Sequence, residues 1–125
     1  RLSDGRRALI LDVGINMLFT SFCYELEVHP GFDTTQSTDE TDIVGPLCMN
    51  IDVIRKNLKY PLLEPGDPVV IPRVGAYNMT QWMQFITFRP AIYLIDENQE
   101  VHMIRKEENL EYMQELEQVP EHLKK

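Results

Sequence analysis

The sequence has little of what marks a membrane, secreted or metal-binding protein. No apolar run approaches the roughly 20 residues of a membrane-spanning helix, so no membrane partner is expected. The arginines near its start precede only the short apolar run 8–13, which is not typical of a signal peptide. Cys23 and Cys48 are too few for a disulfide framework and do not have zinc-site spacing. We therefore predict no metal site and a reduced, cytoplasmic compartment.

Positive charge and familiar catalytic motifs are also scarce. Lys and Arg number 12 against 20 Asp and Glu, a net charge of −8, so nucleic acid is not an expected partner. The sequence contains no GxSxG, no phosphate-binding loop and no HExxH. His29, His102 and His122 are scattered along the chain, and surface or structural roles are favoured for them.

What is present indicates one globular domain over residues 1–125. The chain is long enough for one domain, and 43% hydrophobic with 26% charged residues is typical of a protein with a packed core. It begins with Arg1 rather than Met and runs almost at once into a strand-like segment. This start favours a piece of a longer protein.

Short β-prone segments separated by turn residues dominate the pattern. Six segments are expected to form strands: 8–13, 22–28, 42–48, 68–72, 89–95 and 100–104. The last two form a hairpin, and a polar loop is expected at 29–41. A short helix is expected at 52–58 with Asp52 as its cap, and a surface helix at 107–116. The pattern predicts a mainly β fold, a β-sandwich or Greek-key barrel with short helices and a C-terminal helix.

Two side chains stand out as candidates for chemistry. Cys48 follows Gly45-Pro46 in an expected turn, from which a thiol could project, although local context favours a buried, inert cysteine. Tyr77 follows Gly75-Ala76, where its phenol could reach a phosphate or carboxylate; an ordinary buried tyrosine is equally compatible. The residues alone leave these alternatives open.

Five motifs in order resemble the diaminopimelate and ornithine decarboxylase family, which uses pyridoxal phosphate. Residues 45–52, Gly-Pro-Leu-Cys-Met-Asn-Ile-Asp, resemble its Gly-Pro-x-Cys-x-x-x-Asp segment. Residues 62–67 are similar to its Leu-x-x-Gly-Asp turn, and Gly75-Ala76-Tyr77 to its Gly-Ala-Tyr motif. Residues 85–90 resemble the segment that leads to Arg-Pro, and 9–16 resemble a strand that ends in Asp-x-Gly-x-Asn. The resemblance covers about residues 8–113 and identifies the chain as the family's C-terminal β domain.

The resemblance implies an amino-acid decarboxylase that works as a homodimer with pyridoxal 5′-phosphate. An N-terminal barrel, absent from this chain, would supply the lysine that binds the cofactor and the loop that holds its phosphate. Cys48 would reach the partner subunit's site and return a proton after carbon dioxide leaves. Tyr77, beside Gly75, would donate to the cofactor phosphate. The isolated chain would then be inactive.

The positions that correspond to substrate contacts are Tyr24, Met49, Thr20 and Asp52, and two of them depart from the family pattern. Arg-Pro usually precedes the residue aligned with Tyr24, but the chain has Thr20-Ser21, which cannot clamp a distal carboxylate. An acidic residue usually follows the cysteine, but Met49 cannot pair with an ammonium group. We expect a substrate with an apolar or modified side chain rather than diaminopimelate or a simple diamine precursor.

Three alternatives remain open. The protein could be a catalytically inactive, decarboxylase-like regulator, an amino-acid racemase of the same fold type, or a free-standing β module for binding. Retention of Cys48 and Tyr77 argues against the first. A barrel sequence with its lysine upstream of Arg1 would favour an active enzyme, a barrel without the lysine the regulator, and no barrel the free-standing module. The motif around Cys48 resembles the decarboxylases more closely than the racemases.

Overall fold

The computed structural model describes residues 1–124. The chain divides into two compact units, Arg1–Phe85 and the part from Ile86 onward. This division does not test whether residues 1–125 act as one domain of a longer protein, so that expectation stays a prediction.

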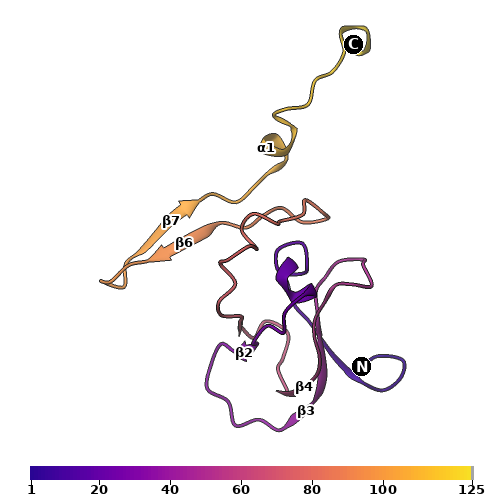
Figure 1. Ribbon diagram of the computed structural model, residues 1–125, viewed down its shortest axis with the longest axis vertical. Coiled ribbons are helices and arrows are strands. Elements are labelled where there is room, and N and C mark those ends of the chain that lie inside the picture. Colours follow the sequence, from indigo (N-terminus) through magenta and orange to yellow (C-terminus); the bar gives the residue numbers. More distant parts are fainter. Residues whose placement is uncertain (125) are drawn as a thin grey trace. The chain divides into compact units, whose positions relative to one another are not determined.

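A three-stranded sheet forms the centre of the first unit (Figure 1). Its strands are β1 (Arg7–Ile10), β3 (Thr38–Val44) and β4 (Val53–Pro61), in the order β1-β3-β4. β1 runs parallel to β3, and β4 runs antiparallel to it with an irregular register near Ile43. A second, two-stranded sheet pairs β2 (His29–Pro30) with β5 (Val69–Val70), and the 3-10 helix η1 spans Phe19–Phe22. Branched side chains such as Ile43 and Ile54 suit these half-buried pleated strands.

The core of the first unit lies against the three-stranded sheet and gathers apolar side chains from strands and loops. Its buried members are Leu11, Leu18, Leu26, Val28, Ile43, Ile54, Tyr60 and Leu63. Ile43 is fully buried, which fits its place on the central strand. Because loop residues such as Leu26 contribute to this core, packing fixes the loops as well as the strands.

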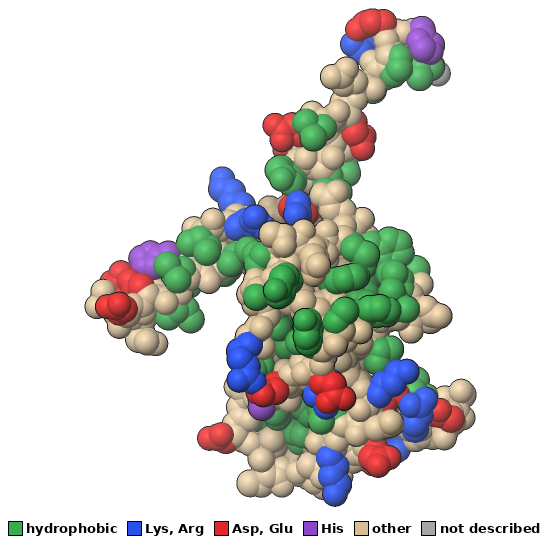
Figure 2. Space-filling view, in the orientation of Figure 1, with side chains coloured by type: hydrophobic (Ala, Val, Ile, Leu, Met, Phe, Trp, Pro, Cys, Tyr) green, Lys and Arg blue, Asp and Glu red, His purple; other side chains and the backbone are tan. Residues whose placement is uncertain are grey.

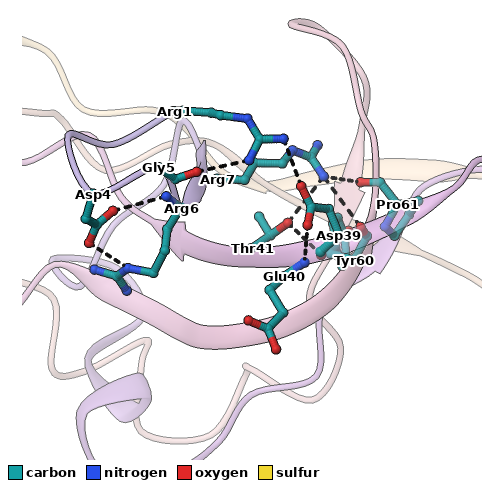
Figure 3. A network of polar contacts seen from close by, with 10 residues as sticks. All are labelled: Arg1, Asp4, Gly5, Arg6, Arg7, Asp39, Glu40, Thr41, Tyr60 and Pro61. Atoms are coloured by element: carbon teal, nitrogen blue, oxygen red, sulfur yellow. Dashed lines mark hydrogen bonds and ion pairs between the residues drawn. The ribbon is translucent and has the colours of Figure 1, made fainter.

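An arginine network ties the start of the chain to the sheet (Figure 3). The Arg7 guanidinium donates to the Pro61 carbonyl at 2.8 Å and to the Thr41 hydroxyl at 3.2 Å. Arg1 forms an ion pair with Asp39 at 3.0 Å. One arginine of β1 thereby contacts both β3 and β4, which supports the parallel pairing of the short edge strand.

The second unit contains a hairpin and two short helices. The hairpin joins β6 (Ile92–Ile95) to β7 (Val101–Arg105), and α1 (Leu110–Gln114) and the 3-10 helix η2 (Glu121–Leu123) follow. Asp96 closes the hairpin turn by accepting the backbone N–H groups of Asn98 and Glu100 at 2.8 and 2.9 Å.

The hairpin buries little of its own apolar surface. Every residue of β7 is exposed, and the exposed apolar side chains of the two strands appear among the green atoms of Figure 2. These exposed side chains are Tyr93, Leu94, Ile95, Val101, Met103 and Ile104. Because a two-stranded hairpin is at best marginally stable alone, this unit needs further packing to be stable.

The predicted mainly β fold, the hairpin and the C-terminal helix are confirmed, the helix being shorter than expected. Within residues 1–124 the strands do not close into a barrel. The predicted helix at 52–58 is wrong, because this segment pairs with β3 as β4. The predicted strand at 22–28 is also wrong: its alternating residues Leu26 and Val28 pack into the core without joining a sheet. The loop predicted at 29–41 holds β2 and the first residues of β3.

No helix within residues 1–124 has both the length and the apolar character needed to cross a bilayer.

Candidate functional site

The loop that carries Cys48 connects β3 to β4 and exposes the thiol. Cys48 is exposed and unpaired, whereas the preceding Leu47 is buried at 7% exposure. The buried position that local context favours for Cys48 is therefore wrong. The buried Leu47 anchors the loop in the protein, while the Cys48 side chain next to it points to the surface.

Asp52 fixes this loop through its carboxylate and its backbone. The residue is 3% exposed, and its carboxylate accepts the backbone N–H groups of Ile15 and Leu47, each at 2.7 Å. Its own N–H donates to the Met49 carbonyl, and its carbonyl accepts the Gly45 N–H, both at 3.0 Å. We call these four hydrogen bonds the Asp52 clamp. They hold residues on both sides of Cys48 and join the loop to the turn at Ile15.

Two glycines make room for the clamp. A Cβ atom at Gly45 would lie 2.3 Å from both carboxylate oxygens of Asp52 and 2.5 Å from the Gly14 Cα. A Cβ atom at Gly14 would lie 2.6 Å from one of the same oxygens. These separations are far below van der Waals contact, so both positions require glycine. Gly14 and Gly45, which belong to two separate sequence motifs, thus pack against the same buried carboxylate of Asp52.

A second buried polar residue, Asn78, fixes the loop that carries Tyr77. Asn78 is 2% exposed; its side-chain oxygen accepts the Thr20 N–H and its side-chain NH₂ donates to the Val74 carbonyl, both at 3.0 Å. We call these two bonds the Asn78 clamp. Tyr77 lies beside it with a left-handed φ of 63° and a 66% exposed side chain. The ordinary buried tyrosine considered from the sequence is therefore wrong.

The Asn78 clamp brings three predicted site residues to one surface pocket. Thr20, Tyr24 and Tyr77 line it together with Arg73 and Glu27. Arg73 and Glu27 form an ion pair at its rim. A hydrogen bond from His29 and the charge of Arg73 hold the pKa of Glu27 below its usual range, against the opposing effect of desolvation.

The predicted residues divide into two groups. Tyr77, Tyr24 and Thr20 share the pocket, with Gly75 exposed in the Tyr77 loop. Cys48 and Met49 do not line this pocket; Tyr24 also borders a second one, shared with Asn50 and Ile51 from the Cys48 loop. The predicted contacts of all these residues with cofactor or substrate stay predictions.

Asp52 differs from the sequence-based expectation in its local role. It does not cap a helix, since β4 begins at Val53. Its carboxylate is buried and already accepts two backbone donors, which leaves little of it to contact a substrate.

Asn78 was not recognised from the sequence. An asparagine directly after Gly-Ala-Tyr is a common turn residue, so its type signalled a turn but not its long-range bond to Thr20. Arg73 was also missed, because only the tertiary structure brings it to the pocket of Thr20 and Tyr24.

The pocket's donors suit a phosphate-bearing ligand in part. The exposed Tyr77 phenol and the Arg73 guanidinium are donors of the kind that bind phosphate oxygens. A Cβ atom at Gly75 would meet nothing within 4 Å, so the chain leaves open space beside Gly75. Glu27 neutralises part of the Arg73 charge, which makes the phenol the clearer donor.

Asp96, Glu100 and His102 in the second unit could offer ligand atoms within 4.8 Å of one another. The group lies at the hairpin turn, where Asp96 already accepts the Asn98 and Glu100 N–H groups. Exposed acidic turns are common, and the expected absence of a metal site stays a prediction.

Comparisons with known proteins agree on one family. Residues 1–75 match the family described as pyridoxal-dependent decarboxylase, C-terminal sheet domain. The chain is 31% identical over 119 residues to diaminopimelate decarboxylase from Helicobacter pylori, covering 93% of this chain and 29% of that protein.

Solved structures show the same likeness. A Helicobacter pylori diaminopimelate decarboxylase complexed with L-lysine superposes with a TM-score of 0.80 at 29% identity, covering 90% of this chain and 28% of that one. Diaminopimelate decarboxylase from M. jannaschi gives a TM-score of 0.86 at 24% identity, covering 98% and 29%, which supports the fold alone. The chain thus spans less than a third of these relatives.

Proposed function

The chain belongs to the pyridoxal-dependent decarboxylase family as its C-terminal sheet domain, and on this premise we propose that it completes the active site of a longer amino-acid decarboxylase. The longer enzyme would be a homodimer in the cytoplasm. The unpaired thiols of Cys23 and Cys48 suit this reducing compartment. The observation that carries the proposal is the pair of clamps, which present an exposed thiol and an exposed phenol on fixed loops.

Tyr77 and Gly75 would serve the cofactor phosphate. The exposed phenol is a hydrogen-bond donor, and the open space beside Gly75 lets a ligand approach the backbone. Pyridoxal phosphate, when bound, would accept the electron pair that carbon dioxide leaves on the substrate. The cofactor's covalent attachment would come from the part of the enzyme outside this chain.

Cys48 would hold and deliver the proton that replaces carbon dioxide. Its thiol is exposed on a loop whose flanking residues are bound to Asp52, so it can enter a site that another subunit contributes. A general acid must be held within hydrogen-bond reach of the atom that it protonates, and a fixed loop meets this need.

The substrate would differ from that of the relatives named diaminopimelate decarboxylase. Met49 is half-buried beside Cys48 and carries no charge for a distal ammonium group. Thr20 is 9% exposed and offers a hydroxyl where a guanidinium would bind a carboxylate. We therefore infer an amino acid with an apolar or modified side chain, bordered by Tyr24.

The test is carbon dioxide release by the longer enzyme, supplied with pyridoxal phosphate and a panel of L- and D-amino acids. We expect release from one substrate and a sharp loss of it in Cys48→Ala. Release that survives unchanged in Cys48→Ala would contradict the role of this thiol. Racemisation, or cofactor binding without any turnover, would overturn the decarboxylase proposal in favour of a racemase or an inactive regulator.

Substrate choice has its own test. Thr20→Arg with Met49→Glu should raise kcat/KM for diaminopimelate relative to the native substrate. Because Thr20 is buried, thermal unfolding of the double variant must first show that it folds. A folded variant with no gain toward diaminopimelate would contradict the proposed pocket.

A further inference from the structure

We propose that Asp52 is a positioning residue that sets the place of the Cys48 thiol, and not a residue that binds the substrate. This inference rests on the proposed function of Cys48. It starts from the position of the thiol between two anchored neighbours. On one side the Leu47 N–H donates to the Asp52 carboxylate at 2.7 Å, and on the other the Met49 carbonyl accepts the Asp52 N–H at 3.0 Å.

Both oxygens of the Asp52 carboxylate are engaged and buried, which keeps a ligand away from them. One oxygen accepts the Ile15 N–H and the other accepts the Leu47 N–H, each at 2.7 Å. Asp52 is 3% exposed, and the Gly14 and Gly45 backbones lie against its oxygens. A substrate ammonium group could reach these oxygens only if the backbone packed around them moved aside. The Cys48 loop would then lose its attachment.

The bond to Ile15 gives the clamp a reference point outside the loop. Ile15 is fully buried, and the neighbouring Gly14 carbonyl accepts the N–H groups of Met17 and Leu18 at 3.0 Å. The turn at 14–18 is therefore fixed independently of the loop. Because the Asp52 carboxylate binds both the Ile15 N–H and the Leu47 N–H, it holds Leu47 against this turn and thereby fixes the backbone of Cys48. Loss of the carboxylate should leave Cys48 exposed but variable in position.

The first measurement is hydrogen exchange of the longer protein without substrate, read on peptides that cover 14–18 and 45–52. Asp52→Asn keeps the size of the side chain but replaces one acceptor oxygen with a donor, so it must lose a bond to Ile15 or Leu47. We expect exchange at the amide that loses its acceptor to quicken by about tenfold or more, since each tenfold step corresponds to about 1.4 kcal/mol. Unchanged protection in the variant would overturn the clamp.

Asp42→Asn is the matched control. Asp42 is also buried, at 6% exposure, and its carboxylate accepts the Asn57 N–H at 3.0 Å and an Arg6 guanidinium N–H. It makes no such bond to the Cys48 loop among the contacts of residues 1–124. We expect this variant to lose stability without quickening exchange at 45–52. Equal effects of both variants on 45–52 would show only general loosening and would contradict the proposal.

The second measurement separates positioning from substrate binding. With the amino acid from the panel that releases carbon dioxide, Asp52→Asn should lower kcat by about 10²-fold and leave KM nearly unchanged, because a displaced catalytic group costs rate. In the Cys48→Ala background, Asp52→Asn should lower kcat little further, because both changes remove the same function. A raised KM, or losses that multiply, would show that Asp52 acts on the substrate directly.

Gly45→Ala reaches the same clamp without changing Asp52. An added Cβ atom would collide with both carboxylate oxygens, so this variant should reproduce the quickened exchange and the kcat loss. If the longer enzyme releases no carbon dioxide from any amino acid, the proposed function is wrong. The claim that Asp52 positions Cys48 for catalysis is then wrong as well. Hydrogen exchange would still decide whether Asp52 fixes the loop.

Discussion

The Cys48 loop and the Tyr77 loop both present an exposed functional group, yet one is held by a charged side chain and the other by a neutral one. Asp52 has only acceptors on its side chain and uses both oxygens for backbone N–H groups. Asn78 has a donor and an acceptor and uses one of each. The chemistry of each clamp thus follows from the backbone groups that its loop leaves unpaired.

The two clamps should differ in energetic weight. Hydrogen bonds to a charged group contribute about 1.5–3 kcal/mol, whereas neutral ones contribute about 1 kcal/mol. Removing either clamp also leaves buried backbone groups without partners. Loss of the Asp52 clamp should therefore cost more stability than loss of the Asn78 clamp.

Asp52→Ala should lower the free energy of unfolding by about 3 kcal/mol or more. The change removes two charge-assisted bonds and leaves the Ile15 and Leu47 N–H groups buried without an acceptor. Urea denaturation of the variant and the parent protein measures the loss. A change below about 1 kcal/mol would mean that the loop relaxes and finds other partners.

Asn78→Ala should cost less, about 1.5 kcal/mol, because two neutral bonds are lost. Asn78→Asp should cost a similar amount, since it keeps the acceptor for the Thr20 N–H but turns a carboxylate oxygen toward the Val74 carbonyl. Cofactor titration of the longer enzyme should show weaker binding in both variants, with Tyr77→Phe as the reference for loss of the phenol alone. An effect larger than that of Asp52→Ala would reverse the comparison.

Glu108 supplies a carboxylate clamp in the second unit whose partner is a guanidinium. It accepts the Arg89 backbone N–H at 3.1 Å and pairs with the Arg89 side chain. The side-chain hydrogen bond to Arg89 lowers the pKa of Glu108, against the opposing effect of burial.

Because the folded-state pKa is lowered, the contribution of Glu108 to stability is present above the ordinary glutamate pKa of about 4.3. It is lost as pH falls through the lower pKa of the folded protein. We expect Glu108→Gln to cost about 1 kcal/mol at neutral pH and progressively less in acid. NMR titration of the Glu108 carboxyl group checks the direction: a midpoint at or above 4.3 would contradict it.

The smallest change in stability is expected on removal of the Tyr60 hydroxyl, because this buried group has no hydrogen-bond partner within residues 1–124. The side chain is 2% exposed, and burial raises the pKa of the phenol. Tyr60→Phe should change the free energy of unfolding by less than about 1 kcal/mol, in the neutral or stabilising direction. A clear destabilisation in urea would reveal a partner for the hydroxyl.

Local sequence signals predicted much of this fold where contacts are local. The hairpin at β6 and β7 follows from two β-prone runs around a polar turn. The surface helix predicted at 107–116 forms as the shorter α1, where Asn109 accepts the Tyr112 N–H as its cap. The segment 52–58 was misread because its few residues were compatible with a helical turn, while pairing with β3 decides its structure. Leu26 and Val28 alternate as in a strand, but core packing alone accounts for their burial.

The β-rich class, the hairpin, the family resemblance and the choice of Cys48 and Tyr77 as site candidates could all be predicted from the sequence. These depend on composition, on short-range patterns and on motif order. The exposure of Cys48 and Tyr77, the burial of Asp52 and the bond between Asn78 and Thr20 follow from long-range packing instead. Burial and the pairing of backbone N–H groups depend on residues tens of positions away, as Asp52 and Ile15 are, and no local pattern encodes such a contact.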